Sequence, residues 1–126
     1  MIVALLAADD PAHAWAAEAF RKNSPFHVCD AVLAEACSFF PTPEPVLTLV
    51  ARRDLILDFE LAKEMPRVLG LVAQYADQPM DLADACVVRM SELSTRCKVW
   101  TVDRRDFTTY RRHGRKTVPC EFPPEI

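Results

Sequence analysis

Glycine is scarce in this sequence, with two residues among 126. Gly70 and Gly114 stand far apart, which excludes the glycine-rich phosphate loops and dinucleotide fingerprints that need several glycines at fixed spacing. Histidine is also rare and scattered, at His13, His27 and His113. Because no Cys-x-x-Cys pair accompanies these histidines, the sequence lacks the ligand spacing of a zinc site.

Long apolar runs are missing as well. The apolar start, Met1–Ala8, is too short to span a bilayer and has no basic residues before it, so neither a membrane span nor a secretory signal is expected. The five cysteines are odd in number and lie mostly in apolar surroundings, which favours reduced, mostly buried thiols. We therefore expect a cytoplasmic protein that does not associate with membranes.

What is present is the composition of one globular domain. Hydrophobic residues make up 51% of the chain and charged residues 26%, and the net charge is −3. A chain of this length fits one domain with a packed core. The slight negative charge does not by itself indicate a nucleic-acid-binding protein, although it leaves room for local basic patches.

Apolar periodicity predicts helices that alternate with short strands. Helices are expected at Asp10–Asn23, Asp30–Phe40, 44–53, Glu60–Tyr75 and Asp81–Leu93. Strands are expected at Phe26–Val28, Leu55–Phe59, Lys98–Val102 and Thr117–Phe122, with a polar, basic loop over 104–116. This alternation indicates an α/β fold with a mainly parallel central sheet flanked by helices. Ligands of such folds bind beyond the carboxyl ends of the strands, where Asp103 is expected.

Several acidic residues lie in apolar surroundings. Glu35 is within a predicted helix, Asp84 is in the first turn of another, and Asp103 ends a strand. Asp81 precedes Asp84 by three residues and reads most simply as a helix cap, and Asp106 follows Asp103. Each acid alone is more often structural than catalytic. Carboxylates gathered at one point, however, repel one another unless a cation neutralises them, and a set of oxygen ligands suits Mg²⁺ or Mn²⁺.

Three short motifs carry a resemblance to a known family. They are Val-Leu-Ala-Glu-Ala at 32–36, Asp-Leu-Ala-Asp-Ala at 81–85 and Thr-Val-Asp-Arg-Arg-Asp-Phe at 101–107. In order and spacing they resemble the second, third and fourth acidic motifs of PIN-domain ribonucleases, most closely the VapC-like toxins of bacterial type II toxin–antitoxin systems. The resemblance covers essentially the whole chain. It implies a single PIN-like domain over 1–126 with a three-layer fold.

The sequence departs from the family pattern at its start. PIN domains open with a strand that ends in a metal-binding Asp, whereas Met1–Leu6 looks like the helix that follows this strand. We therefore expect the chain to be truncated at its N-terminus, with the native start about eight residues upstream. The missing Asp leaves an alternative open, in which the protein is a catalytically impaired PIN-like scaffold that binds a partner protein or RNA.

The resemblance implies a metal-dependent endoribonuclease that hydrolyses RNA phosphodiester bonds. Glu35, Asp84 and Asp103 are its implied catalytic residues and ligands of Mg²⁺ or Mn²⁺, with a metal-activated water as nucleophile. Asp81 and Asp106 are candidates for holding water or outer contacts, and Thr101 for orienting Asp103 through its hydroxyl. A generic α/β metal-dependent hydrolase with a different substrate is a further alternative.

A basic segment follows Asp103. Arg104, Arg105, Arg111 and Arg112 are candidate RNA-binding residues, and Tyr110 is a candidate for stacking on a base. The alternative for such a charge run is an ordinary solvated surface. The resemblance further implies a cognate antitoxin that wraps the early helices, and a homodimer.

Overall fold

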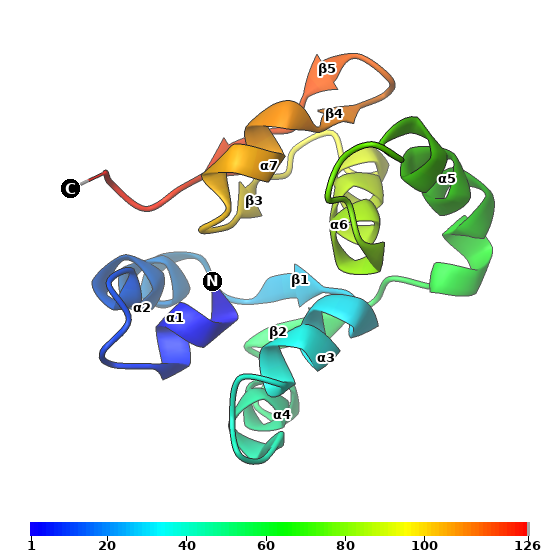
Figure 1. Ribbon diagram of the computed structural model, residues 1–126. Helices are drawn as coiled ribbons and strands as arrows, with labels where there is room; N and C mark the ends of the chain where they lie inside the picture. Colours follow the sequence, from blue (N-terminus) through cyan, green and yellow to red (C-terminus); the bar gives the residue numbers. More distant parts are fainter. Residues whose placement is uncertain (126) are drawn as a thin grey trace. The chain divides into compact units, whose positions relative to one another are not determined.

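The computed structural model describes residues 1–125, which form seven helices and six short strands (Figure 1). The mixed α/β class expected from the sequence is therefore confirmed. The contacts divide the chain into two compact units, which we describe separately. The first unit holds Met1–Asp58 and the residues from Pro123 onward, and the second holds Phe59–Phe122.

The first unit contains four helices and one parallel strand pair. In chain order its elements are α1 (Ile2–Leu6), α2 (His13–Asn23), β1 (Phe26–Val28), α3 (Asp30–Cys37), α4 (Glu44–Ala51) and β2 (Leu55–Leu57). β1 and β2 run parallel, with Phe26 opposite Leu55. All the helices and strands predicted for this unit are present, with ends that differ by a few residues. Asp10 accepts a hydrogen bond from the Ala12 backbone N–H (2.8 Å) in the turn before α2.

The core of the first unit is apolar. Its buried residues come from helices and strands alike: Ile2, Phe20, Val28, Ala36, Val46, Leu49 and Leu55. The His13 side chain hydrogen-bonds through Nδ1 to the Ala4 backbone oxygen at 2.9 Å, which ties α2 to the short helix α1. A helix of five residues is too short to be stable alone, so α1 depends on this contact and on the burial of Ile2.

The second unit contains three helices and two strand pairs. Its elements are α5 (Leu61–Gln74), α6 (Leu82–Leu93), β3 (Val99–Trp100), α7 (Arg104–Thr109), β4 (Arg111–Arg112), β5 (Lys116–Thr117) and β6 (Cys120–Glu121). β3 pairs with β6 in parallel, and β4 pairs with β5 as an antiparallel hairpin (Figure 1). The hairpin turn contains Gly114 at φ 82°, a conformation that glycine adopts without steric strain.

The expectation of a loop over 104–116 was wrong. This segment forms α7 and the β4–β5 hairpin. α7 begins where Asp103 caps it, and Phe107 anchors it in the core with 4% of its surface exposed. Few apolar residues mark this helix in the sequence, so its formation depends on the cap and on tertiary packing rather than on a periodic pattern.

The core of the second unit is larger and more aromatic. Its buried members are Val68, Leu71, Tyr75, Met80, Ala85, Val88, Phe107, Tyr110 and Val118. Beside it, Glu92 of α6 receives hydrogen bonds from Arg67 of α5 (2.7 and 2.9 Å), from Arg89 (3.2 Å) and from the His113 backbone N–H (2.7 Å). The Glu92 side chain is 1% exposed, so this buried ion-pair network joins α5, α6 and the hairpin.

The strands of residues 1–125 form three two-stranded sheets, two parallel and one antiparallel. Two of the three pairs are parallel, which agrees with the expected mainly parallel pairing, but the strands of residues 1–125 do not join into the expected central sheet. The five cysteines are thiols, with Cys29 and Cys86 buried and the other three partly exposed. None of the helices within residues 1–125 has both the length and the apolar character needed to cross a membrane.

Candidate functional site

Two helices of the second unit begin with the same arrangement of aspartates. Asp81 caps α6, and its Oδ1 accepts a hydrogen bond from the Asp84 backbone N–H at 2.9 Å. Asp103 caps α7, and its Oδ1 accepts one from the Asp106 backbone N–H at 3.0 Å. These bonds satisfy donors that a helix start leaves unpaired, so capping explains the first aspartate of each pair. Asp84 and Asp106 lie in the first turns of these helices, where the helix dipole favours a negative charge. The Asp84 carboxylate also accepts a hydrogen bond from the Asp81 backbone, which acts to lower the pKa of Asp84.

The carboxylate of Asp84 is partly buried and receives a hydrogen bond from a buried phenol. The Tyr110 hydroxyl donates to Asp84 Oδ2 at 2.8 Å. Burial raises the pKa of Asp84 to about 6, the bond from Tyr110 opposes this rise, and the negative charges of Asp81 and Asp103 add to it. The site therefore resists the ionisation of Asp84 and favours any positive charge that enters it.

Asp106 is subject to similar effects. Burial, a hydrogen bond with Asp103 and the charges of Asp103 and Asp81 raise the pKa of Asp106, while the nearby Arg105 lowers it. The charges of Asp84, Asp103 and Asp106 likewise act on Tyr110, whose pKa is raised mainly by burial. The second unit thus gathers Asp81, Asp84, Asp103 and Asp106 into one electrostatically interacting group, which we call the aspartate cluster.

Thr101 supports the start of α7. Its Oγ1 accepts a hydrogen bond from the Asp103 backbone N–H at 3.0 Å. The expected hydroxyl contact between the two residues is therefore present, but it holds the backbone of Asp103 rather than its carboxylate. The carboxylate is oriented by its own cap bond to Asp106.

Glu35 lies in the first unit, exposed near the end of α3. Its charge, together with that of Asp10, acts on the Met1 amino group, where burial lowers the pKa and these two acids oppose the change. Because Glu35 and the aspartate cluster belong to different units, their convergence on one metal ion stays a prediction.

The donor set of the aspartate cluster is purely carboxylate, which is chemically suited to Mg²⁺ or Mn²⁺. Within residues 1–125, however, no three His, Cys, Asp or Glu side chains stand in an arrangement ready to hold a metal ion. One oxygen each of Asp81 and Asp103 is engaged with a backbone N–H.

The four candidate RNA-binding arginines fall into two groups. Arg104 and Arg105 are exposed on α7, beside the aspartate cluster in sequence. The Arg104 guanidinium lies over the Phe122 ring, 4.7 Å from its centroid. The positive charge of Arg105 acts on Asp106. Both arginines are therefore exposed, and the charge of Arg105 is close enough to Asp106 to affect its pKa.

Arg111 and Arg112 are partly buried and bind backbone oxygens. Arg111 Nη1 donates to the carbonyl of Thr108 (2.7 Å) and to those of the next two residues, at the end of α7. Arg112 Nη1 donates to the carbonyl of Ser91 at 2.8 Å, near the end of α6. Cations at helix C-termini stabilise backbone carbonyls that lack a partner within the helix. Arg111 and Arg112 therefore have a structural role that the sequence did not reveal.

Tyr110 is the residue whose role sequence reasoning missed. It was expected to stack on a base, but its ring is 0% exposed and packs edge-on against Tyr75 and Phe107, with centroids 5.2 Å away in both cases. Tyr110 directly follows the end of α7 in an extended conformation, so no helical periodicity marks its burial in the sequence. The partner of its hydroxyl, Asp84, lies 26 positions earlier and leaves no local trace in the sequence.

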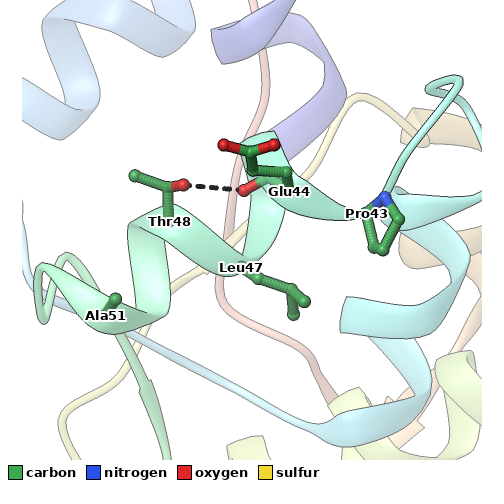
Figure 2. Close-up of a pocket in the computed structure, with 5 residues that line it drawn as sticks. All are labelled: Pro43, Glu44, Leu47, Thr48 and Ala51. Atoms are coloured by element: carbon green, nitrogen blue, oxygen red, sulfur yellow. Dashed lines mark hydrogen bonds between the residues drawn. The ribbon is translucent and has the colours of Figure 1, made fainter.

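An open hollow of about 340 Å³ lies on α4 of the first unit. Figure 2 shows its lining by Pro43, Glu44, Leu47, Thr48 and Ala51, with the Thr48 hydroxyl donating to the Glu44 backbone oxygen at 2.7 Å. With one ionisable side chain and a mostly apolar wall, the hollow lacks the converging polar groups of a catalytic pocket. It is not the candidate catalytic site.

Comparisons with family models and with curated proteins give no relative on which to build. No family model matches the chain, and no curated protein matches it. The assignment of a function therefore depends on the motifs and on the geometry of the aspartate cluster.

Proposed function

We propose that this protein is a metal-dependent endoribonuclease of the PIN type. The observation that carries the proposal is the aspartate cluster, in which Asp84 stays partly buried next to the charges of Asp81 and Asp103. Such an arrangement is unfavourable for the fold alone and becomes favourable when a cation is bound. The order of the acidic motifs along the chain supports the same class. The proposal implies the three-layer PIN arrangement, with a central, mainly parallel sheet.

Asp84 and Asp103 would hold Mg²⁺ or Mn²⁺, with Glu35 as the third ligand that the family resemblance implies. A divalent ion at such a site supplies an activated water and neutralises charge on the phosphoryl group. Asp81 fixes the Asp84 backbone, and Asp106 fixes Asp103 through the cap bond. The chain's own contribution is thus to hold two carboxylates in place at the starts of two helices.

Arg104 and Arg105 would bind the RNA backbone. Their exposure and their position directly after Asp103 support this role, since arginine pairs with phosphate through its planar guanidinium. Arg111 and Arg112 would contribute indirectly, because they hold the ends of α7 and α6.

The proposal extends to a cytoplasmic toxin that is neutralised by an antitoxin and forms a homodimer. Exposed apolar side chains of the first unit support a protein partner, because Phe39 is 66% and Leu47 45% exposed. Leu47 also lines the hollow on α4. Apolar surface of this kind is typical of contact areas.

A catalytically impaired scaffold is the second candidate. It is favoured by one observation, the absence of a ready three-ligand metal group within residues 1–125. The scaffold would bind RNA or a partner protein through the same surfaces but would not cleave RNA.

Metal dependence separates the two candidates. We expect the protein to cleave a mixed-sequence, fluorescently labelled single-stranded RNA in the presence of Mn²⁺ and to lose this activity in EDTA. As the matched control, the EDTA-treated protein should regain activity when excess Mn²⁺ or Mg²⁺ is added and should stay inactive when only buffer is added. RNA that stays intact at saturating Mn²⁺, with a folded protein by circular dichroism, would favour the scaffold.

The double variant Arg104→Ala/Arg105→Ala should bind RNA more weakly, with a reduced dependence on salt. For single-stranded RNA, the loss of two phosphate contacts reduces the steepness of the decrease of log affinity with log salt by about 1.4. Fluorescence anisotropy without divalent metal measures binding without cleavage. Arg21→Ala/Lys22→Ala is the control, because it removes two exposed cations of α2 that pair with Glu18. Equal slopes for the two double variants would indicate that Arg104 and Arg105 are ordinary surface charges.

A further inference from the structure

The β4–β5 hairpin concentrates positive charge in a chain that is negative as a whole. Residues 111–117 include four arginine or lysine residues and no acid, whereas the net charge of the chain is −3. Arg112 and Lys116 occupy directly opposite positions in the hairpin register. Like charges at such positions destabilise a strand pair. The charge pattern of the hairpin is therefore not one that its own folding favours.

The basic residues of the hairpin divide into two kinds. Arg111 and Arg112 are partly buried, and their guanidinium groups bind backbone carbonyls of the fold. The other kind forms the hairpin tip, which we define as His113, Arg115 and Lys116, and all three residues are exposed. Within residues 1–125, neither Arg115 nor Lys116 forms an ion pair. The charges of the hairpin tip are therefore available to a ligand.

The hairpin tip is held in place by the C-terminal end of α6. The His113 backbone N–H donates to Glu92 at 2.7 Å, and Arg112 Nη1 donates to the Ser91 carbonyl at 2.8 Å. The Glu92 side chain is 1% exposed and already engaged by two arginines, so it does not offset the exposed charges. An anchored hairpin presents its cations with a smaller ordering cost on binding than a mobile loop does.

The hairpin tip and the aspartate cluster lie toward opposite ends of α6. Asp84 is in the first turn of this helix and Glu92 is eight residues later. At 1.5 Å per residue, this separation is about 12 Å along the helix axis. β4 covers the same length, because Tyr110, just before it, binds Asp84, and His113, just after it, binds Glu92 (Figure 1). A strand of RNA that follows β4 away from the aspartate cluster would therefore reach the hairpin tip.

We propose that the hairpin tip is a second RNA-contact surface, which binds backbone phosphates of a single-stranded RNA at a distance from the aspartate cluster. This inference rests on the proposed function, since it takes RNA as the substrate. Guanidinium and ammonium groups are the natural partners of phosphate. The exposed residues 113–117 include no large apolar side chain, whereas protein interfaces have an apolar core that is depleted of lysine. The chemistry of the tip therefore favours RNA over a protein partner.

The variant Arg115→Ala/Lys116→Ala removes the two charges and keeps the hydrogen bonds that anchor the hairpin. We expect it to bind a labelled single-stranded RNA of about 20 nucleotides about 10-fold more weakly, with the decrease of log affinity with log salt less steep by about 1.4. Fluorescence anisotropy in EDTA measures binding without cleavage. The swap Arg115→Lys/Lys116→Arg keeps both charges and should retain the affinity within about 2-fold, because counterion release depends on charge. Arg21→Ala/Lys22→Ala, which removes two exposed cations elsewhere, should also retain it.

Three results would overturn the inference. Equal affinities and salt dependences for the Arg115/Lys116 and Arg21/Lys22 alanine variants would reject the hairpin tip as an RNA contact and leave the proposed nuclease activity standing. Unlabelled polyglutamate that competes as strongly as RNA of equal charge would indicate an acidic protein segment as the ligand. Failure of the unaltered protein to bind RNA would reject the RNA contact outright. Conversely, RNA binding that depends on the hairpin tip, without cleavage in Mn²⁺, would support the contact and reject the nuclease.

Discussion

Replacing Asp84 or Asp103 by asparagine is expected to abolish Mn²⁺-dependent RNA cleavage while leaving the fold intact. Asparagine keeps the oxygen that accepts from Tyr110 at position 84 and the oxygen that caps α7 at position 103. It removes only the negative charge that a metal ion needs. We expect single-turnover rates to fall by at least about 100-fold, beyond the 10–100-fold typical of outer-sphere changes. Circular dichroism checks the fold.

The same Asp84→Asn variant should be more stable than the unaltered protein at neutral pH. The raised pKa of Asp84, about 6, means that the folded state favours the protonated form, so ionisation above pH 6 destabilises the fold. Removing this charge should raise the free energy of unfolding by about 1–2 kcal/mol, because solvent partly screens it. The gain should shrink as the pH falls from about 6 towards the unfolded-state value of about 3.9, where the aspartate is protonated in both states.

Asp77→Asn is the matched control for both measurements, because Asp77 is an exposed acid of the same unit. It should change neither cleavage nor stability appreciably. Full activity of both Asp84→Asn and Asp103→Asn would remove the basis for the site assignment. A less stable Asp84→Asn variant at pH 7 would show that the carboxylate serves the fold.

Glu92→Gln should be the most destabilising of the conservative substitutions discussed. Glu92 is the shared acceptor of Arg67, Arg89 and the His113 N–H, with its side chain 1% exposed. Glutamine leaves Arg67 without its counter-charge in partly buried surroundings, whereas Arg89 keeps its ion pair with Glu64. Removing one partner of a buried ion pair typically destabilises a protein by about 3–5 kcal/mol. Urea denaturation measures the loss. The comparison variant is Glu18→Gln, whose exposed pair with Arg21 should contribute little.

The stabilisation by Glu92 should also depend on pH. Burial raises the pKa of Glu92, but the hydrogen bonds from Arg67, His113 and Arg89 outweigh this and hold it at about 2. A depressed folded-state pKa gives stability that is present above the unfolded value and is lost as the pH falls from about 5 to 2. Glu92→Gln should therefore flatten this part of the acid denaturation curve. An acid transition as steep as that of the unaltered protein would contradict the assignment.

Much of the fold could be predicted because its helices carry periodic apolar patterns. Most of the observed elements lie close to their predicted positions, namely the helices α2 to α6 and the strands β1, β2 and β3. α7 was missed because it is six residues long, with Phe107 as its one buried residue. A local cue existed in the repeated Asp-x-x-Asp step, since Asp103 and Asp106 have the same spacing as Asp81 and Asp84.

The candidate site was predictable as residue types but not as contacts. Asp84 and Asp103 stood out by their apolar surroundings, and the structure brings their charges within mutual influence. The bond from Tyr110 and the capping by Arg112 join positions 26 and 21 residues apart, which a sequence pattern cannot reveal. Charge alone suggested RNA contacts for Arg111 and Arg112, whereas their guanidinium groups bind backbone carbonyls.

The two Asp-x-x-Asp motifs, Asp81/Asp84 and Asp103/Asp106, have an evolutionary consequence. The two proposed ligands occupy different positions in the motif: Asp103 is the N-cap of α7, whereas Asp84 lies in the first turn of α6, after the N-cap. A descendant that no longer needed chemistry could neutralise position 84 and gain stability, but position 103 would still have to offer an oxygen to start its helix. Relatives of this fold that have lost catalysis would therefore lose the acid at position 84 freely, whereas position 103 would keep a capping residue such as asparagine or serine.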